Sequence, residues 1–447
     1  MLRRAWPVYA LLVVVCILIA FTSTSFIYPD EHFQNPEIAA SLVFSHGYVG
    51  DGLLETSEWT GDSPCRSIIP VFGSTGLAFT IFRAVVGTDP SARALFVAQR
   101  GMMLLFSFLS DYLVWTTSHS DLSGLVHLLA LGPPAALSFT ATSLLVSLSD
   151  TIYIASTFPL SPIRFILTPL NLLRYNLSSE NLASHGLHPQ YLHIFANWPM
   201  LFGAGLAVVW SAAMSRSEVE KQDGKKAESW RRVYLALFVI PTLLLSIQPH
   251  QEPRFLMPLI IPLVLLAPYA SFFRSGRGGA TLWILHTILF IVLFGYLHQS
   301  GFLPALFELN AEFRRPPSEL SGTNQIDLVF WKTFMPPRHL LLPAGSTAFP
   351  AIRIIDLAGA PRSDNLEHPV LLIAPAYIVD KLALACNPSS ASTENGGSTA
   401  ADESMCLEAY LGGASFGVHV DMDRLGEFFS ASSWERVGVG VWEVQRR

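Results

Sequence analysis

The sequence predicts an α-helical polytopic membrane protein with a small α/β domain in its C-terminal part. Hydrophobic residues make up 51% of the 447 residues and charged residues only 14%, whereas soluble domains carry roughly 25% charged residues. The apolar residues are gathered in runs long enough to cross a bilayer, which takes about 20 residues as a helix. After residue 299 these long runs give way to short, strand-like runs.

Eight apolar runs are predicted to span the membrane, and a ninth is broken by prolines. The broken run covers residues 151–173, so it is either a further span or a re-entrant element. The first run follows Arg3 and Arg4 and exceeds the roughly 7–15 residues of a signal-peptide core, so we expect a retained helix. The predicted spans are residues 7–27, 68–88, 95–115, 124–149, 193–214, 232–249, 254–272 and 280–298.

The lysines and arginines of short loops predict how the chain is oriented. Arg3 and Arg4 place the N-terminus in the cytoplasm, and the basic loop 215–231 is assigned to the same side. Between residues 95 and 175 the predicted spans do not alternate between the two sides of the membrane unless the broken run also crosses it. Three polar loops then fall in the lumen, together with the tail after Gln299; they are residues 28–67, 174–192 and 249–254 of a membrane catalytic domain, 1–298.

Residues 299–447 are predicted to form a lumenal α/β domain. The runs Val370–Ala374 and Val437–Trp442 have the apolar, β-branched composition of strands. Residues 387–404 are rich in Ser, Thr, Asn and Gly, which predicts a disordered loop. Cys386 and Cys406 flank this loop, and the sequence leaves open whether they pair in an oxidising lumen.

The first polar loop, residues 28–37, begins where the first span ends and reads Tyr-Pro-Asp-Glu-His-Phe-Gln-Asn-Pro-Glu. Adjacent carboxylates at a membrane surface are costly unless they face water, a partner or a substrate. Asp30 and Glu31 are therefore candidate general bases for a hydroxyl nucleophile, the alternative being a charged helix end at the interface. His32 and Gln34 keep the loop polar and are candidate substrate-binding residues.

A second polar cluster contains His250, Glu252 and Arg254, with Pro253 fitting the first turn of the next helix. A helix N-terminus beside an arginine suits an anionic group such as a phosphate. The alternative is an arginine that extends along a helix end to reach water. Arg66 is another predicted lumenal cation beside a helix start.

His185 and His188 lie three residues apart in a loop that contains Gly186 and Pro189. A third metal ligand is not evident nearby, so we expect them to bind sugar hydroxyls or the first loop, or to be plain loop histidines. The four cysteines show no metal-ligand spacing, and we predict no metal. The sequence has no basic stripe or nucleic-acid motif, and we predict no nucleic-acid partner.

These motifs resemble those of the glycosyltransferase family 22 mannosyltransferases. The resemblance rests on residues 28–34, 64–67 and 250–255 and covers roughly residues 20–115 and 135–270. The segment Asn181–Pro189, followed by His193–Pro199, narrows it to the branch that adds the fourth mannose in glycosylphosphatidylinositol (GPI) anchor synthesis, especially its fungal members.

The resemblance implies a C-type glycosyltransferase fold in the endoplasmic reticulum membrane with a lumenal active site. It implies inverting transfer of an α-1,2-linked mannose from dolichyl-phosphate-mannose to the third mannose of the GPI precursor glycolipid, without a cofactor. By the same resemblance, Asp30 is the base for the acceptor 2-hydroxyl with Glu31 as its neighbour, and His250 and Arg254 bind the donor phosphate. Membrane lipids and the two glycolipids are the expected partners; protein partners are left open.

One region departs from the family. Between Tyr112 and Pro133 the family has a longer segment with the element Arg-x-Phe-Ser-Asn-Ser-x-Glu, which is missing here together with a hydrophobic hairpin. Two alternatives therefore stay open: a sister enzyme for another GPI mannose or a dolichol-linked oligosaccharide, and a shortened member that binds without turnover. A transporter is disfavoured because the charges lie in loops rather than along the spans.

Overall fold

The described part of the chain falls into two compact units. Unit 1 comprises residues 1–56, 69–106 and 291–447, and unit 2 comprises residues 57–68 and 107–290. The predictions about the loop 387–404, the Cys386–Cys406 pair and His185 lie outside the described residues. The computed structural model describes residues 2–28, 30–44, 56–61, 63–119, 132–157, 165–178, 187–214, 225–270, 277–315, 325–341, 351–357, 369–376, 378–379, 405–410, 415–420 and 438–446.

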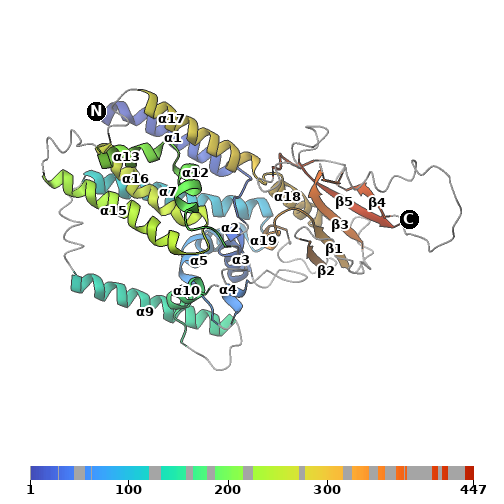
Figure 1. The fold of residues 1–447 in the computed structure, drawn as a ribbon. Coiled ribbons are helices and arrows are strands. Elements are labelled where there is room, and N and C mark those ends of the chain that lie inside the picture. Colours follow the sequence, from blue (N-terminus) through green and yellow to red (C-terminus); the bar gives the residue numbers. More distant parts are fainter. Residues whose placement is uncertain are drawn as a thin grey trace. The chain divides into compact units, whose positions relative to one another are not determined.

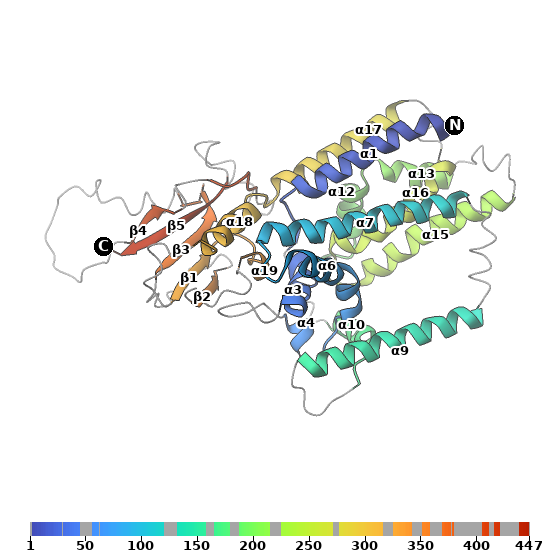
Figure 2. The same cartoon turned by 180° about the vertical axis from the view of Figure 1, so that it is seen from behind.

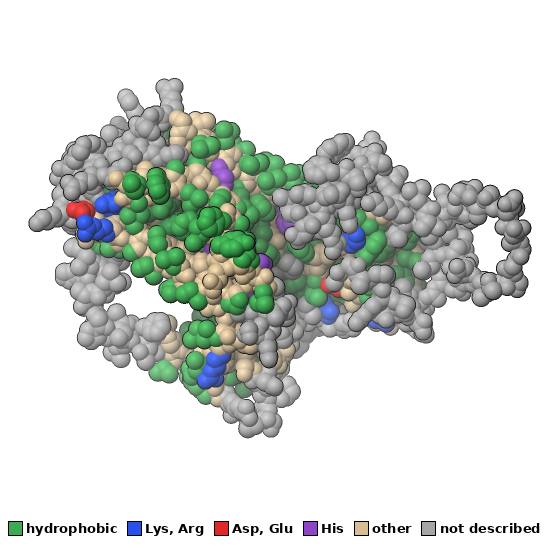
Figure 3. Space-filling model, in the orientation of Figure 1, with side chains coloured by type: hydrophobic (Ala, Val, Ile, Leu, Met, Phe, Trp, Pro, Cys, Tyr) green, Lys and Arg blue, Asp and Glu red, His purple; other side chains and the backbone are tan. Residues whose placement is uncertain are grey.

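The described residues include helices that are long and apolar enough to cross a membrane. On the face drawn in Figure 3, hydrophobic side chains predominate over the helices and charged side chains are few. Large apolar side chains that a soluble protein would bury are exposed here, such as Leu145 at 64% and Ile284 at 56%. The fold class of a polytopic α-helical membrane protein is thus confirmed. The membrane-length helices cover Ile68–Val86, Ala92–Thr116, Glu228–Ile247 and Gly278–Leu297.

Unit 1 joins the first helix and its following segment to the C-terminal region. Asn35 Nδ2 donates to Ser74 Oγ over 3.0 Å, and Arg83 donates to the carbonyl of Val43, so α3 packs along η1 and α6. Helix α18 buries Phe302, whose ring lies 5.8 Å from that of Phe330. The helices of unit 1 are α1 (Leu2–Thr22), α2 (Asp30–Phe33), α3 (Pro36–Phe44), η1 (Phe72–Gly76), α6 (Leu77–Val86), η5 (Val292–Leu297), α18 (Phe302–Phe313) and α19 (Arg338–Leu341).

The C-terminal region holds a five-stranded sheet of order β2-β1-β3-β5-β4. Strand β1 runs parallel to both β2 and β3, with Val329 opposite Leu372, while β5 is antiparallel to β3 and β4. Figure 2 shows α18 beside the sheet, where it contacts β5. Strands were thus expected correctly at residues 370–374 and, within the run 437–442, from Val439 onward. The strands are β1 (Gln325–Phe330), β2 (Ala351–Asp356), β3 (Val370–Pro375), β4 (Met405–Ala409) and β5 (Val439–Arg446).

One part of unit 2 is a set of helices around an apolar core. Phe238 of α15 and Leu263 of α16 lie at its centre, with Val208 of α13 packed beside them. Figures 1 and 2 both show α12, α13, α15 and α16 side by side. The elements of unit 2 are α4 (Ser57–Thr60), α9 (Gly132–Thr157), α10 (Thr168–Leu177), η2 (His193–Asn197), α12 (Trp198–Phe202), α13 (Gly205–Met214), α15 (Lys225–Ile247), η3 (Pro253–Leu259), α16 (Ile260–Leu266) and η4 (Ala267–Tyr269). Helices α5 (Ile68–Val71), α7 (Ala92–His119) and α17 (Arg277–Ile291) each have residues in both units.

Two predicted spans are not single straight helices. The segment predicted at 254–272 is a 3₁₀ helix, a short α-helix and a second 3₁₀ turn, because its prolines cannot donate to an α-helical ladder. The segment predicted at 193–214 bends by 112°. The bend lies at Gly203, whose φ of +45° is a conformation that favours glycine.

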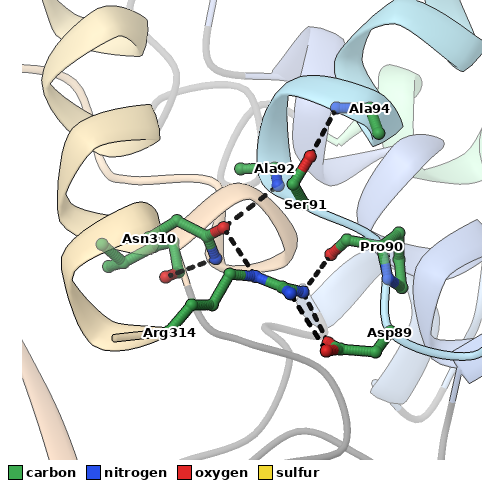
Figure 4. Close-up of polar contacts among 8 residues, drawn as sticks. Asp89, Pro90, Ser91, Ala92, Ala94, Asn310 and Arg314 are labelled. Atoms are coloured by element: carbon green, nitrogen blue, oxygen red, sulfur yellow. Dashed lines mark hydrogen bonds and ion pairs between the residues drawn. The ribbon is translucent and has the colours of Figure 1, made fainter. Parts of the chain in front are cut away.

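The predicted side of the loop after the second apolar run conflicts with the predicted side of the C-terminal region. The sequence placed the loop 87–91 in the cytoplasm and residues after 299 in the lumen, yet the two are bonded together. Arg314 Nη1 donates to Asp89 Oδ2 over 3.0 Å, and the backbone N–H of Ala92 donates to Asn310 Oδ1 over 3.1 Å (Figure 4). The loop 87–91 and the residues after 299 therefore lie on the same side, so the two predicted sides cannot both hold. The described part of the broken run at 151–173 forms the end of α9 and most of the ten-residue α10.

Candidate active site

The first candidate segment follows α1 in unit 1. Asp30 begins α2, and its side chain lies outside the described part of the chain. The exposed Glu31 accepts hydrogen bonds at Oε1 from the backbone N–H groups of Ile27, over 2.8 Å, and Tyr28, over 3.4 Å. Glu31 thereby fixes the chain immediately before α2. This contact suits a residue that positions its neighbour Asp30.

His32 and Gln34, predicted to bind substrate, differ in their surroundings. Gln34 is half-buried in the turn between α2 and α3. His32 is 2% exposed, and its ring packs 5.0 Å from that of Phe26 and 5.9 Å from that of His339. Burial lowers the pKa of His32 well below its usual value, and the charges of His339 and Arg100 add to this. In this structure His32 is therefore a neutral side chain in contact with protein groups.

The second candidate segment forms a polar cluster in unit 2, consisting of His188, His250, Glu252 and Arg254 (the donor cluster below). His250 Nε2 lies 2.7 Å from Glu252 Oε1, and Arg254 forms an ion pair with the other carboxylate oxygen. The ring of His188 lies 5.7 Å from that of His250. The structure thus brings four of the predicted residues together. A carboxylate between two nitrogen groups fixes the position of each relative to the other.

Gln251 ties the donor cluster to the rest of unit 2, a role that sequence reasoning missed. Its side chain is 1% exposed. Oε1 accepts a 2.9 Å hydrogen bond from the backbone of His193, and Nε2 donates to the carbonyl of Ser246 over 3.0 Å. Its own N–H donates to His188 Nδ1 over 3.3 Å. One buried amide therefore joins η2, the end of α15 and the His188 loop.

An apolar groove of about 550 Å³ adjoins the donor cluster within unit 2. Leu237, Pro241 and Leu244 of α15 form one wall, and Pro258 and Pro262 line the opposite side. Phe255 also lines it and directly follows Arg254 in the chain, whose guanidinium lies 5.6 Å from the Phe255 ring centre. The groove is thus apolar, and its lining begins one residue after Arg254 in the chain.

Arg66 lies in another part of unit 2. It pairs with Glu58 through two bonds, Nε to Oε2 at 3.0 Å and Nη2 to Oε1 at 2.6 Å. The next two residues, Ser67 and Ile68, both donate to the buried carboxylate of Asp150. Sequence reasoning missed Asp150, although a lone carboxylate within an apolar run signals a need for partners.

Metal binding has no candidate among the described residues, where no group of three histidine, cysteine or acidic side chains is placed to hold an ion. His185 and the side chain of Asp30 are outside those residues, so the absence of a metal stays a prediction. Asn176-Leu177-Ser178 has the form of an N-glycosylation triplet. Asn176 lies in the last turn of α10, and its Nδ2 donates to the carbonyl of Leu172 over 2.9 Å.

Membrane-length helices and a half-buried polar cluster near an apolar groove define a polytopic membrane protein with a candidate active site. The profile described as the Alg9-like mannosyltransferase family matches residues 6–157 and 128–343. The chain therefore belongs to this family and is a glycosyltransferase.

Relatives extend the comparison. "GPI mannosyltransferase 4" of Emericella nidulans is 27% identical over 86% of this chain and 83% of its own length. "GPI alpha-1,2-mannosyltransferase 4" of Homo sapiens is 35% identical over 58% of this chain and 45% of its own length. "GPI mannosyltransferase 4" of Aspergillus oryzae is 26% identical over 83% of this chain and 84% of its own length. No solved structure matches the chain significantly.

The alignments also bear on the departure seen in the sequence. The Emericella nidulans alignment runs over 485 positions, more than the 447 residues of this chain. That relative therefore has segments that this chain lacks. The family profile matches in two stretches that overlap at residues 128–157, beside the region between Tyr112 and Pro133.

Proposed function

We propose that the chain transfers an α-1,2-linked fourth mannose from dolichyl-phosphate-mannose to the third mannose of a GPI precursor. The names of the Emericella nidulans and human relatives support this acceptor and linkage. The reaction takes place in the endoplasmic reticulum membrane, with the site on the lumenal side, and uses no cofactor other than the donor lipid.

The observation that carries the proposal is the donor cluster beside the apolar groove. Dolichyl-phosphate-mannose joins a sugar to a long isoprenoid through a phosphate. His250 and Arg254 offer hydrogen-bond donors for the phosphate. Glu252 holds the two together, because its Oε1 lies 2.7 Å from His250 Nε2 and its other oxygen forms an ion pair with Arg254. The groove begins at the next residue, Phe255, and its leucine and proline walls suit the isoprenoid.

The proposed reaction is a single displacement. Asp30 takes the proton of the acceptor 2-hydroxyl, and the hydroxyl oxygen forms a bond to C1 of the donor mannose. The bond from C1 to the phosphate oxygen breaks, and dolichyl phosphate leaves with the electron pair. His250 and Arg254 stabilise the negative charge that develops on the phosphate. Glu31 keeps the start of α2 in place through its backbone contacts.

The test uses microsomes from cells that lack the fourth GPI mannosyltransferase, supplied with this chain and labelled dolichyl-phosphate-mannose. We expect conversion of three-mannose to four-mannose precursors by the parent, and a rate lower by about 100-fold or more for Asp30→Asn. Asp111→Asn, which alters an exposed carboxylate of α7, is the matched control and should keep parental activity.

Three other outcomes would overturn the proposal in different ways. Labelling of a different acceptor would identify a sister enzyme of the family. No labelling by a well-expressed parent would identify a shortened member without turnover. Equal activity of the parent and Asp30→Asn would remove Asp30 as the base.

A further inference from the structure

Glu37 and His339 form a buried pair that joins the first polar segment to the C-terminal region. His339 Nδ1 lies 2.6 Å from Glu37 Oε2, and the backbone N–H of His339 donates to the same oxygen over 3.2 Å. Both side chains are completely buried. Glu37 lies in the first turn of α3 and His339 in α19, so the pair fixes the start of α3 against α19.

The same histidine also contacts α2. The ring of His339 lies 5.9 Å from that of His32, which is two residues after Asp30 in a four-residue helix. His32 is in turn packed against Phe26, at 5.0 Å. His339 therefore touches the segments on both sides of the turn that joins α2 to α3. A displacement of His339 would move α2 and its first residue.

Helix α19 is itself held from other directions. Asn310 Nδ2 donates to the carbonyl of Leu341 over 3.2 Å, and Asn310 Oδ1 accepts from the backbone N–H of Ala92 over 3.1 Å. Arg314, one turn further along, pairs with Asp89 (Figure 4). The position of α19 is thus set by α18 and the start of α7, independently of Glu37.

We propose that His339 is a positioning residue for Asp30, so that the C-terminal region helps to set the geometry of the active site. This inference rests on the proposed function, in which Asp30 is the base. A base must be held to within a fraction of an ångström, and a misplacement of about 1 Å can lower the rate by about 100-fold. The buried pair with Glu37 supplies that constraint at a point seven residues from the base.

The test compares His339→Leu, His339→Asn and His339→Gln in the microsomal assay. The amide nitrogen of asparagine can occupy the place of Nδ1 and donate to Glu37, whereas that of glutamine corresponds to Nε2. We expect kcat to fall at least tenfold for His339→Leu and His339→Gln, with the donor KM within about threefold of the parent. His339→Asn should recover most of the parental kcat. Glu37→Gln, which keeps an acceptor oxygen, should also stay close to the parent.

Arg353→Gln is the matched control, because Arg353 pairs with the buried Asp327 over 2.6 Å within the same C-terminal region. It disrupts a buried carboxylate pair without touching α2, so kcat should stay within about threefold of the parent. An equal loss of kcat in Arg353→Gln, a fully active His339→Leu, or an Asn variant no better than the Gln variant would each overturn the inference. Inactivity of the parent would instead overturn the proposed function.

Discussion

The hydroxyl of Thr168 donates a 2.6 Å hydrogen bond to Oδ2 of Asp150, and both side chains are buried in unit 2. The other oxygen, Oδ1, accepts from Ser67 Oγ over 3.0 Å and from the backbone N–H of Ile68 over 2.9 Å. One carboxylate in α9 therefore holds the start of α10 and the loop that carries Arg66. The shape of that loop depends on Asp150 rather than on the loop residues alone.

Replacing Asp150 should destabilise unit 2. Asp150→Ala leaves three donors without their acceptor, two of them buried, so we expect the free energy of unfolding to fall by about 3 kcal/mol. Thr168→Val removes only one of the three bonds and should cost about 1 kcal/mol. Thermal unfolding of the two purified variants in detergent measures both effects. Equal melting temperatures for the parent and Asp150→Ala would show that the carboxylate is not a structural centre.

Gly203 makes the bend between α12 and α13 possible, and its replacement tests that geometry. A Cβ atom at this position would lie 2.2 Å from the ring of His286, and the φ of +45° is unfavourable for alanine. We expect Gly203→Ala to lower the free energy of unfolding by about 3 kcal/mol or more. Gly73→Ala is the matched control, since a Cβ there meets nothing within 4 Å. A Gly203→Ala variant as stable as the control would contradict the bend.

Periodicity and composition predicted much of the fold because apolar runs and strand-like runs are local signals. The apolar run at 69–86 shows where that reasoning ends. Its length and hydropathy allow a crossing, but the contact of Asp89 with Arg314 puts the loop after it beside residues that the sequence assigned to the other side. Such a contact joins residues 225 positions apart, so the local sequence pattern does not reveal it. The broken helix after Pro253 did have a local signal, in its further prolines.

The candidate site shows the same division. The donor cluster was predicted because His250, Glu252 and Arg254 are close in sequence and chemically unusual between apolar runs. The pairing of Glu37 with His339 was not predicted, because the two residues are 302 positions apart and His339 belongs to none of the polar motifs. Glu37 itself was part of the first polar segment, and a carboxylate that becomes fully buried must find a partner.

The donor cluster predicts how Arg254 affects binding. In the proposed mechanism Arg254 binds the donor phosphate and stabilises the charge that develops on it, so we expect Arg254→Ala to raise the donor KM and to lower kcat, with kcat/KM at least tenfold lower. Arg254→Lys keeps the charge but not the planar geometry of the guanidinium, so its donor KM should lie between those of the parent and of Arg254→Ala. Initial rates at varied dolichyl-phosphate-mannose in microsomes measure this. An unchanged donor KM in Arg254→Ala would exclude this arginine from the donor site.

His419 predicts how the stability of unit 1 depends on pH. Its side chain is completely buried, and burial, followed by the charge of His298, lowers its pKa to about 3. In the unfolded chain a histidine has a pKa of about 6.5. Between these values the unfolded state binds a proton that the folded state does not. The stability from His419 is therefore present above about pH 6.5 and is lost as the pH falls, by about 1.4 kcal/mol per unit.

The measurement is the melting temperature of the parent and of His419→Gln in detergent between pH 7.5 and pH 5. At pH 5 the titration of His419 should have cost the parent about 2 kcal/mol relative to pH 7.5. His419→Gln cannot titrate there, so its melting temperature should fall less steeply over the same range. The pKa of His32 is also lowered, and His32 is present in both proteins, so it adds the same slope to each. Parallel curves for the two proteins would show that His419 is not held neutral in the folded state.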